Sequence, residues 1–160
     1  MNKMTQKILH SNAGLEALIL RIPTGLILAA HGSQKLFAWF GGYGLEGSAQ
    51  WMDSIGLHPG LMMATLAGSA ELFGGIALML GILTRPAALA SALTMLVALF
   101  WVHWANGFFL SSKGIEYALA LLSATSALVL MGGGAYSLDR YLLEGPSLEI
   151  NHERKDPTTR

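Results

Sequence analysis

The sequence contains no cysteine and little charge. None of its 160 residues is Cys, and only 12% are Asp, Glu, Lys or Arg. The lack of cysteine excludes disulfides, thiol relays, thiolate metal sites and iron–sulfur ligation by this chain. Ten basic and ten acidic residues balance to a formal net charge of zero. Overall charge therefore gives no reason to expect a nucleic-acid partner.

The residues that are present are unusually apolar. Hydrophobic residues make up 52% of the chain, and its mean hydropathy is +0.47. Soluble domains are less apolar and carry about twice as much charge. The length leaves room for several membrane spans but not for a separate soluble catalytic domain of typical size. The composition therefore indicates an integral membrane protein in contact with the lipid bilayer.

Four apolar runs between turn residues are each long enough to cross a membrane. About 20 helical residues, at 1.5 Å rise each, cover the hydrocarbon core. Short connections make consecutive helices antiparallel neighbours. The sequence therefore predicts an all-α fold, a four-transmembrane-helix antiparallel bundle within residues 15–143. The expected spans are about 15–36, 60–83, 87–104 and 115–131.

The connections and ends of the chain predict an orientation. Most basic residues precede the first span, lie in the second loop or follow the fourth span, so the positive-inside rule places both termini in the cytoplasm. Residues 1–14 are expected to form a cytoplasmic tail, and residues 144–160 a disordered one. A cleaved signal peptide is a poor alternative for the first span, because Arg21 interrupts its apolar stretch and no small-residue cleavage site follows.

The first loop contains a candidate interfacial helix at residues 45–55. Its apolar residues Leu45, Ala49, Met52 and Ile55 fall near one helical face, as in a helix lying on a membrane surface. Aromatic residues gather around the expected outer ends of the spans, where interfacial anchors are common. They are Phe37, Trp39, Phe40, Tyr43, Trp51, Trp101, Trp104, Phe108 and Phe109.

A carboxylate, Glu71, lies at the centre of the second expected span. A charge at that depth costs roughly 3 kcal/mol on insertion scales, so a partner is expected. Small residues at Gly68 and Gly75 lie on the same face of the helix and allow a neighbouring helix to approach closely. By depth, Arg21 or His31 of the first span is the expected partner.

Five ionisable residues fall on inward stripes of the four spans, which predicts a polar pocket that opens toward the outer face. They are Arg21, His31, Glu71, His103 and Glu116. Each has a plainer interpretation when taken alone. Arg21 can extend to the inner interface, Lys35 and Glu116 fit boundary charges, and His103 fits an interfacial histidine.

The order of several motifs resembles the DoxX family of small four-helix bacterial inner-membrane proteins. The resemblance is carried by Arg21, HGSQKL at 31–36, SIGLHPG at 54–60, AELFGGIALMLGILTRPAA at 70–88, His103, GFF at 107–109 and Glu116. It implies a multi-pass protein of the bacterial inner (plasma) membrane. The family takes its name from a subunit of an archaeal quinol-oxidase or thiosulfate:quinone oxidoreductase system, and other relatives are associated with quinone or oxidative stress. The family's polar positions map onto Arg21, Gly32, Lys35, Glu71, Gly75, His103 and Glu116.

The first functional hypothesis is an accessory subunit of a membrane redox or oxidative-stress system that binds a quinone or quinol. Glu71, His103 and Glu116 would exchange protons. Arg21, His31, Lys35 and Trp104 would bind the ligand, while Gly32, Gly68 and Gly75 would serve helix packing. The lack of cysteine argues against sulfur-relay chemistry, and thiosulfate oxidation does not follow from the family name.

The second hypothesis is a non-enzymatic scaffold whose buried charges set helix packing and recruit a partner. A redox partner protein and a homo-oligomer both stay open. A solute or proton carrier is less well supported, because no internal repeat is evident. A metal or haem site is not expected, since the histidines lack HxxH or ExxH spacing.

Overall fold

The computed structural model describes residues 3–144, and this part of the chain contains helices and loops but no strand. The α-helices are α1 (Lys3–Leu9), α2 (Leu15–Phe37), α3 (Gly44–Ser54), α4 (Gly60–Leu80), α5 (Thr84–Val97), α6 (Glu116–Met131) and α7 (Leu138–Glu144). A π-helical segment, η2 (Ala98–His103), continues α5, and short 3₁₀ turns lie at Trp39–Gly41, Trp104–Asn106 and Leu110–Ser112.

Three of the helices are long and apolar enough to cross a membrane. They are α2, α4, and α5 together with its continuation to Asn106. Helix α6 is equally apolar in character but has 16 residues, which makes it about 24 Å long. The described part of the chain is therefore all-helical, with three helices that fit membrane spans by length and composition. A fourth crossing by α6 stays a prediction.

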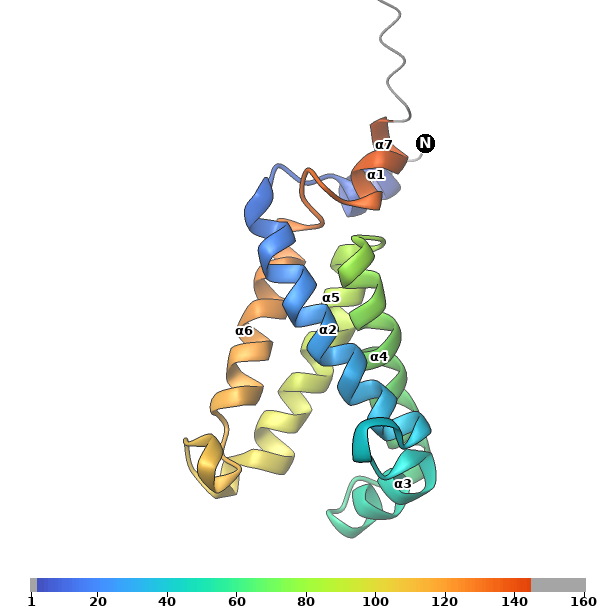
Figure 1. Cartoon of the computed structure of the whole chain (residues 1–160), viewed down its shortest axis with the longest axis vertical. Coiled ribbons are helices and arrows are strands. Elements are labelled where there is room, and N and C mark those ends of the chain that lie inside the picture. The colour runs from blue at the N-terminus through green and yellow to red at the C-terminus, as the bar shows by residue number, and fades with distance from the viewer. Residues whose placement is uncertain (1–2, 145–160) are drawn as a thin grey trace, which may run out of the picture.

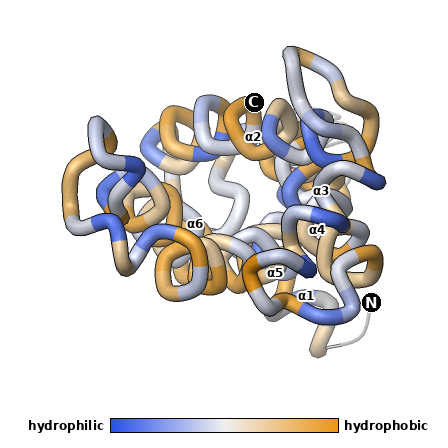
Figure 2. The backbone as a smooth tube through the Cα atoms, turned by 90° about the horizontal axis from the view of Figure 1, so that it is seen from below, coloured by the Kyte–Doolittle hydropathy of each residue, from blue (hydrophilic) through white to orange (hydrophobic). Residues whose placement is uncertain are grey.

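The helices run between two distinct ends of the molecule (Figure 1). We call the end that holds α1, α7 and the 132–137 segment the termini end, and the end that holds α3 and the α5–α6 connection the loop end. Helix α2 packs against α4, α5 packs against α6, and α4 also contacts α5. Viewed from the loop end, hydrophobic residues lie along all of these helices, with hydrophilic residues among them (Figure 2). Many large apolar side chains are exposed on them, as expected of surfaces that face lipid.

Glycines allow α2 and α4 to touch through their backbones. A Cβ atom added at Gly25 would lie 2.5 Å from the carbonyl oxygen of Gly75. One added at Gly32 would lie 2.7 Å from the carbonyl oxygen of Gly68. Both distances are far shorter than any van der Waals contact, so only glycine permits this spacing. This contact sets the rotation of α2 about its axis, and therefore which of its polar residues face α4.

Side chains bound to backbone groups hold the termini end together. Arg21 is 2% exposed. Its guanidinium donates to the carbonyl oxygens of Leu78 and Met79 at 3.0 and 2.5 Å, and to that of Tyr136. The Asp139 carboxylate accepts from the N–H groups of Leu83 and Thr84 at 2.7 and 2.9 Å. It thereby caps the start of α5 from outside that helix.

The ends of α4 and α5 differ from the predicted spans, and a glycine and a proline explain the difference. Helix α4 ends at Leu80 because Gly81 adopts φ 66° and its N–H bonds back to Leu78, the usual left-handed helix end. Helix α5 begins at Thr84, with Pro86 in its first turn, where proline is favoured. Part of the predicted tail at 1–14 is helical, as α1. The predicted disordered tail lies outside the described residues apart from its first position.

Helix α3 forms almost where the amphipathic pattern places it. Its apolar residues Ala49 and Met52 are buried against Ala64 of α4. The apolar face of α3 is therefore packed on another helix of the protein.

Candidate functional site

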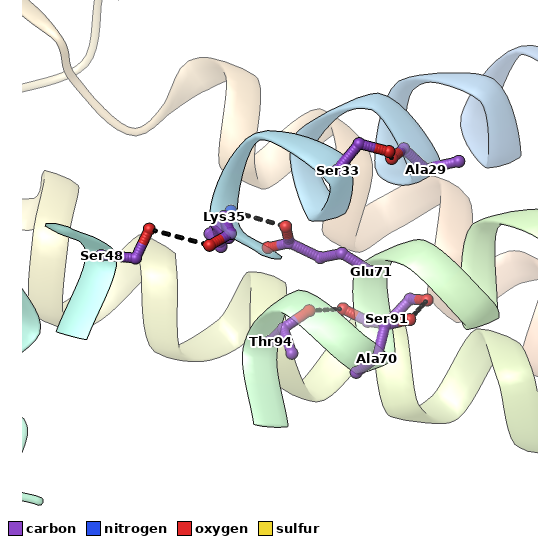
Figure 3. Close-up of polar contacts among 8 residues, drawn as sticks. All are labelled: Ala29, Ser33, Lys35, Ser48, Ala70, Glu71, Ser91 and Thr94. Carbon is purple, nitrogen blue, oxygen red and sulfur yellow. Dashed lines mark hydrogen bonds and ion pairs between the residues drawn. The ribbon is translucent and has the colours of Figure 1, made fainter. Parts of the chain in front are cut away.

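Glu71 forms an ion pair with Lys35. The Lys35 Nζ lies 2.5 Å from Glu71 Oε2, and the side chains are 25% and 4% exposed. Lys35 comes from the last turn of α2, and Glu71 from the middle of α4 (Figure 3). The predicted pairing of Glu71 with Arg21 or His31 is wrong. Glu71 is instead paired with Lys35, whose place in the sequence fits a charge at the membrane boundary.

Helix rotation and depth explain this correction. Successive residues of a helix are turned by about 100°, and Gly32 faces α4 directly. His31 is therefore turned away from the Gly32 contact, and its ring lies 6.0 Å from that of Tyr117 on α6. Lys35 lies one turn beyond Gly32 on the same face. Arg21 lies near the opposite end of α2, where backbone carbonyls bind it.

A pocket of about 480 Å³ lies beside this ion pair, between α4 and α5, with α3 at one end. We call it the α4–α5 pocket. Twelve apolar residues line it, and the polar side chains come from Lys35, Glu71, Thr94 and His103. An apolar cavity with a few converging polar groups is the usual form of a small-molecule site.

The π-helical segment η2 brings His103 to the pocket. A π-helix bonds residue i to i+5, so His103 follows Ala98 on the same face, and both line the pocket. The His103 Nδ1 lies 2.7 Å from the carbonyl oxygen of Lys113. Because a carbonyl oxygen only accepts, this bond places a proton on Nδ1. In the neutral ring Nε2 is then a hydrogen-bond acceptor, and it is the nitrogen left for a ligand.

Four of the predicted proton-exchanging and ligand-binding residues do not line the pocket, namely Arg21, His31, Trp104 and Glu116. Glu116 accepts a hydrogen bond at 2.9 Å from the N–H of Leu110 and so shapes the α5–α6 loop. The Trp104 ring lies 5.2 Å from that of Phe100 and is mostly exposed. The structure thus gathers Lys35, Glu71 and His103 from the predicted set. Gly32 and Gly75 lie at the α2–α4 contact, and Gly68 lies against Lys35 and Leu36.

The sequence reasoning missed Thr94. Its hydroxyl donates to the carbonyl oxygen of Ser91 at 2.8 Å, and it lines the pocket. The available signal was that Ser91, Thr94 and His103 are the polar residues of the 87–104 span. Within residues 3–144, no group of three or more His, Asp or Glu residues is placed to hold a metal ion.

Comparisons with known proteins place the chain in a family. The DoxX family model matches residues 17–104, more than half of the chain. The chain is 34% identical to "Putative oxidoreductase CatD" of Bacillus subtilis, over 80% of this chain and 87% of that protein. It is 38% identical to "Inner membrane protein YqjF" of Escherichia coli, over 62% of this chain and 75% of the other. An uncharacterised Haemophilus influenzae protein is 32% identical over 75% and 85%. No solved structure matches the chain. The chain belongs to the DoxX family of membrane proteins.

Proposed function

We propose that the protein is an accessory component of a membrane redox or oxidative-stress system and holds a quinone or quinol in the α4–α5 pocket. The observation that carries this proposal is the apolar pocket whose polar side chains include the Lys35–Glu71 ion pair and His103. In the proposed setting the protein lies in a bacterial inner membrane. Its termini end faces the cytoplasm and its loop end faces outward, as the distribution of basic residues favours.

The polar groups match the chemistry of this ligand class. A quinone carbonyl accepts hydrogen bonds, and the Lys35 ammonium has three N–H donors. A quinol hydroxyl donates, and His103 Nε2 and the Glu71 carboxylate can accept. Both acceptors belong to residues that exchange protons in other proteins. A volume of about 480 Å³ lies within the range of pockets that hold small organic ligands.

The relatives support the two coarser parts of the proposal. One is named a putative oxidoreductase, which favours a redox setting. Another is named an inner membrane protein, which favours the location. Neither name specifies a ligand, so the quinone assignment rests on the pocket itself.

Extraction of the purified protein tests the proposal. We would purify wild type and variants in mild detergent, extract them with organic solvent and quantify quinones by mass spectrometry. A near-stoichiometric quinone is expected in wild type and in Glu116→Gln, whose carboxylate lies outside the pocket. It should be lost in Glu71→Gln and His103→Ala. Wild-type protein that is reproducibly empty and shows no saturable binding of added quinone would overturn the proposal.

The runner-up is a scaffold in which the Lys35–Glu71 pair serves helix packing alone. The pair joins α2 to α4, so it can stabilise their contact without any ligand. On this hypothesis Glu71→Gln lowers stability or the recovery of a partner protein, while His103→Ala changes neither. Loss of bound quinone in His103→Ala, with stability retained, separates the two hypotheses in favour of the first.

A further inference from the structure

We infer that the ligand of the α4–α5 pocket enters sideways from the lipid, between α4 and α5, and is therefore a quinone that carries a long apolar tail. The inference rests on the proposed function and names its substrate class. Three features of the described structure carry it: the divergence of the two helices, an apolar wall at the loop end of the pocket, and apolar residues that belong to both the pocket and the outer surface.

The first feature is the divergence of α4 and α5. The two helices are in close contact at Gly74, where an added Cβ would lie 2.6 Å from the Ser91 hydroxyl oxygen. Ser91 also lies 3.4 Å from the carbonyl oxygen of Ala70. The α4 residues that line the pocket all precede Gly74, and the α5 residues that line it follow Ser91, except Ala90, which lies next to it. The pocket is thus a wedge that closes toward the termini end.

The second feature is the apolar loop-end wall of the pocket. Helix α3 packs on α4 through Ala49 and Met52, and Met52, Trp51 and Leu57 form part of the pocket wall. The indole N–H of Trp101 donates to the carbonyl oxygen of Ile55 at 3.1 Å, so it connects η2 to the residue that follows α3. Apolar side chains and this connection therefore form the loop-end wall of the pocket.

The third feature is the apolar mouth. Leu66 of α4 and Leu93 and Val97 of α5 line the pocket, yet they are 58%, 55% and 47% exposed. Both helices belong to the set long and apolar enough to cross a membrane. Residues on such helices that are at once exposed and in the pocket wall mark an opening toward lipid.

The pocket has polar groups at its inner wall and apolar groups at its mouth, which matches a ligand with a polar head and an apolar tail. The buried Glu71 and its partner Lys35 lie at the inner wall, while Leu66, Leu93 and Val97 lie at the mouth. A ring with carbonyl or hydroxyl groups would bind inside, and an attached hydrocarbon tail would leave through the mouth. The tail would then remain in an apolar environment throughout.

The test compares two quinones with the same ring, one with a long isoprenoid tail and one with a methyl group in its place. Binding to the full-length protein in lipid nanodiscs is measured with each quinone expressed as its mole fraction in the lipid, so that membrane partitioning alone gives no preference. We expect the tailed quinone to bind at least tenfold more tightly, because the part of the tail nearest the ring would also pack against Leu66, Leu93 and Val97. Leu93→Trp should weaken its binding at least fivefold. Leu130→Trp, the same change at an exposed position of α6, should not.

The outcomes separate this inference from the proposed function. Equal binding of the two quinones, with no effect of Leu93→Trp, would overturn sideways entry and leave the quinone site intact. Absence of saturable binding for both quinones to wild type would overturn the proposed function and the inference with it. Because Leu93 is exposed, its replacement leaves the buried core unchanged, and a thermal unfolding curve would verify that the variant is folded.

Discussion

The Lys35–Glu71 ion pair makes a quantitative prediction about stability. At 2.5 Å and an effective dielectric constant near 20, the attraction is about 7 kcal/mol, before the cost of removing the charges from water. Breaking a buried pair on one side typically costs about 3–5 kcal/mol. Lys35 is a quarter exposed, and water screens it in part. We therefore expect Lys35→Met and Glu71→Gln each to lower the free energy of unfolding by about 3 kcal/mol.

The double variant tests the reasoning. Once one partner is removed, the second substitution removes a charge that is already unpaired, so Lys35→Met/Glu71→Gln should cost no more than either single change. The assay is unfolding by sodium dodecyl sulfate in mixed micelles, followed by tryptophan fluorescence. Lys113→Met, at an exposed lysine of the α5–α6 loop, is the control and should change little. Additivity of the two single effects within about 0.5 kcal/mol would show that the residues are not coupled.

Three further predictions concern other parts of the fold. Gly32→Ala should destabilise the protein by about 2 kcal/mol in the same assay, because the added methyl group meets the α4 backbone. An unchanged midpoint of the unfolding curve would contradict that contact. Asp139→Ala should cost about 3 kcal/mol, because two N–H groups at the start of α5 lose a charged acceptor, and Asp139→Asn should cost less. The ring of His58 and then the N–H of Gly60 lower the pKa of Asp53 below its ordinary value of 3.8. A carboxyl group with a lowered pKa stabilises the folded state at pH values above its ordinary pKa, and this stabilisation is lost as pH falls through the lowered pKa. The amide hydrogen of Gly60 should therefore lose protection from exchange below about pH 3.8. In Asp53→Asn this pH dependence should be absent.

The sequence predicts the helices well because their signals are local. Long apolar runs, Gly60 after a proline and the glycine-rich turns locate α2, α4 and α6 within a few residues. The stripe of small residues around Glu71 indicates the close approach of another helix. These features depend on composition and period, which a single chain segment carries by itself.

The partner of Glu71 could not be predicted in the same way. Counting residues gives the depth of a side chain but not the rotation of one helix against another. That rotation is set by the contact at Gly32, which directs Lys35 toward the acid and His31 toward α6. The π-helical turn before His103 is a second case, because a uniform period of 3.6 residues does not anticipate it. Glu116 binds a loop N–H, an arrangement that depends on the loop's backbone path.

The bonds of Arg21 also define an order of assembly during synthesis. Its acceptors at Leu78 and Met79 are made 57 and 58 residues after it, and its acceptor at Tyr136 is made 115 residues after it. All of these carbonyl groups are therefore synthesised after α2. The hydrogen bond of Arg21 to Tyr136 forms only when the chain beyond α6 has left the ribosome and folded back. A chain that ends at Met131 would contain α2, α4, α5 and α6. Arg21 of α2 would still lack its hydrogen bond to the carbonyl oxygen of Tyr136.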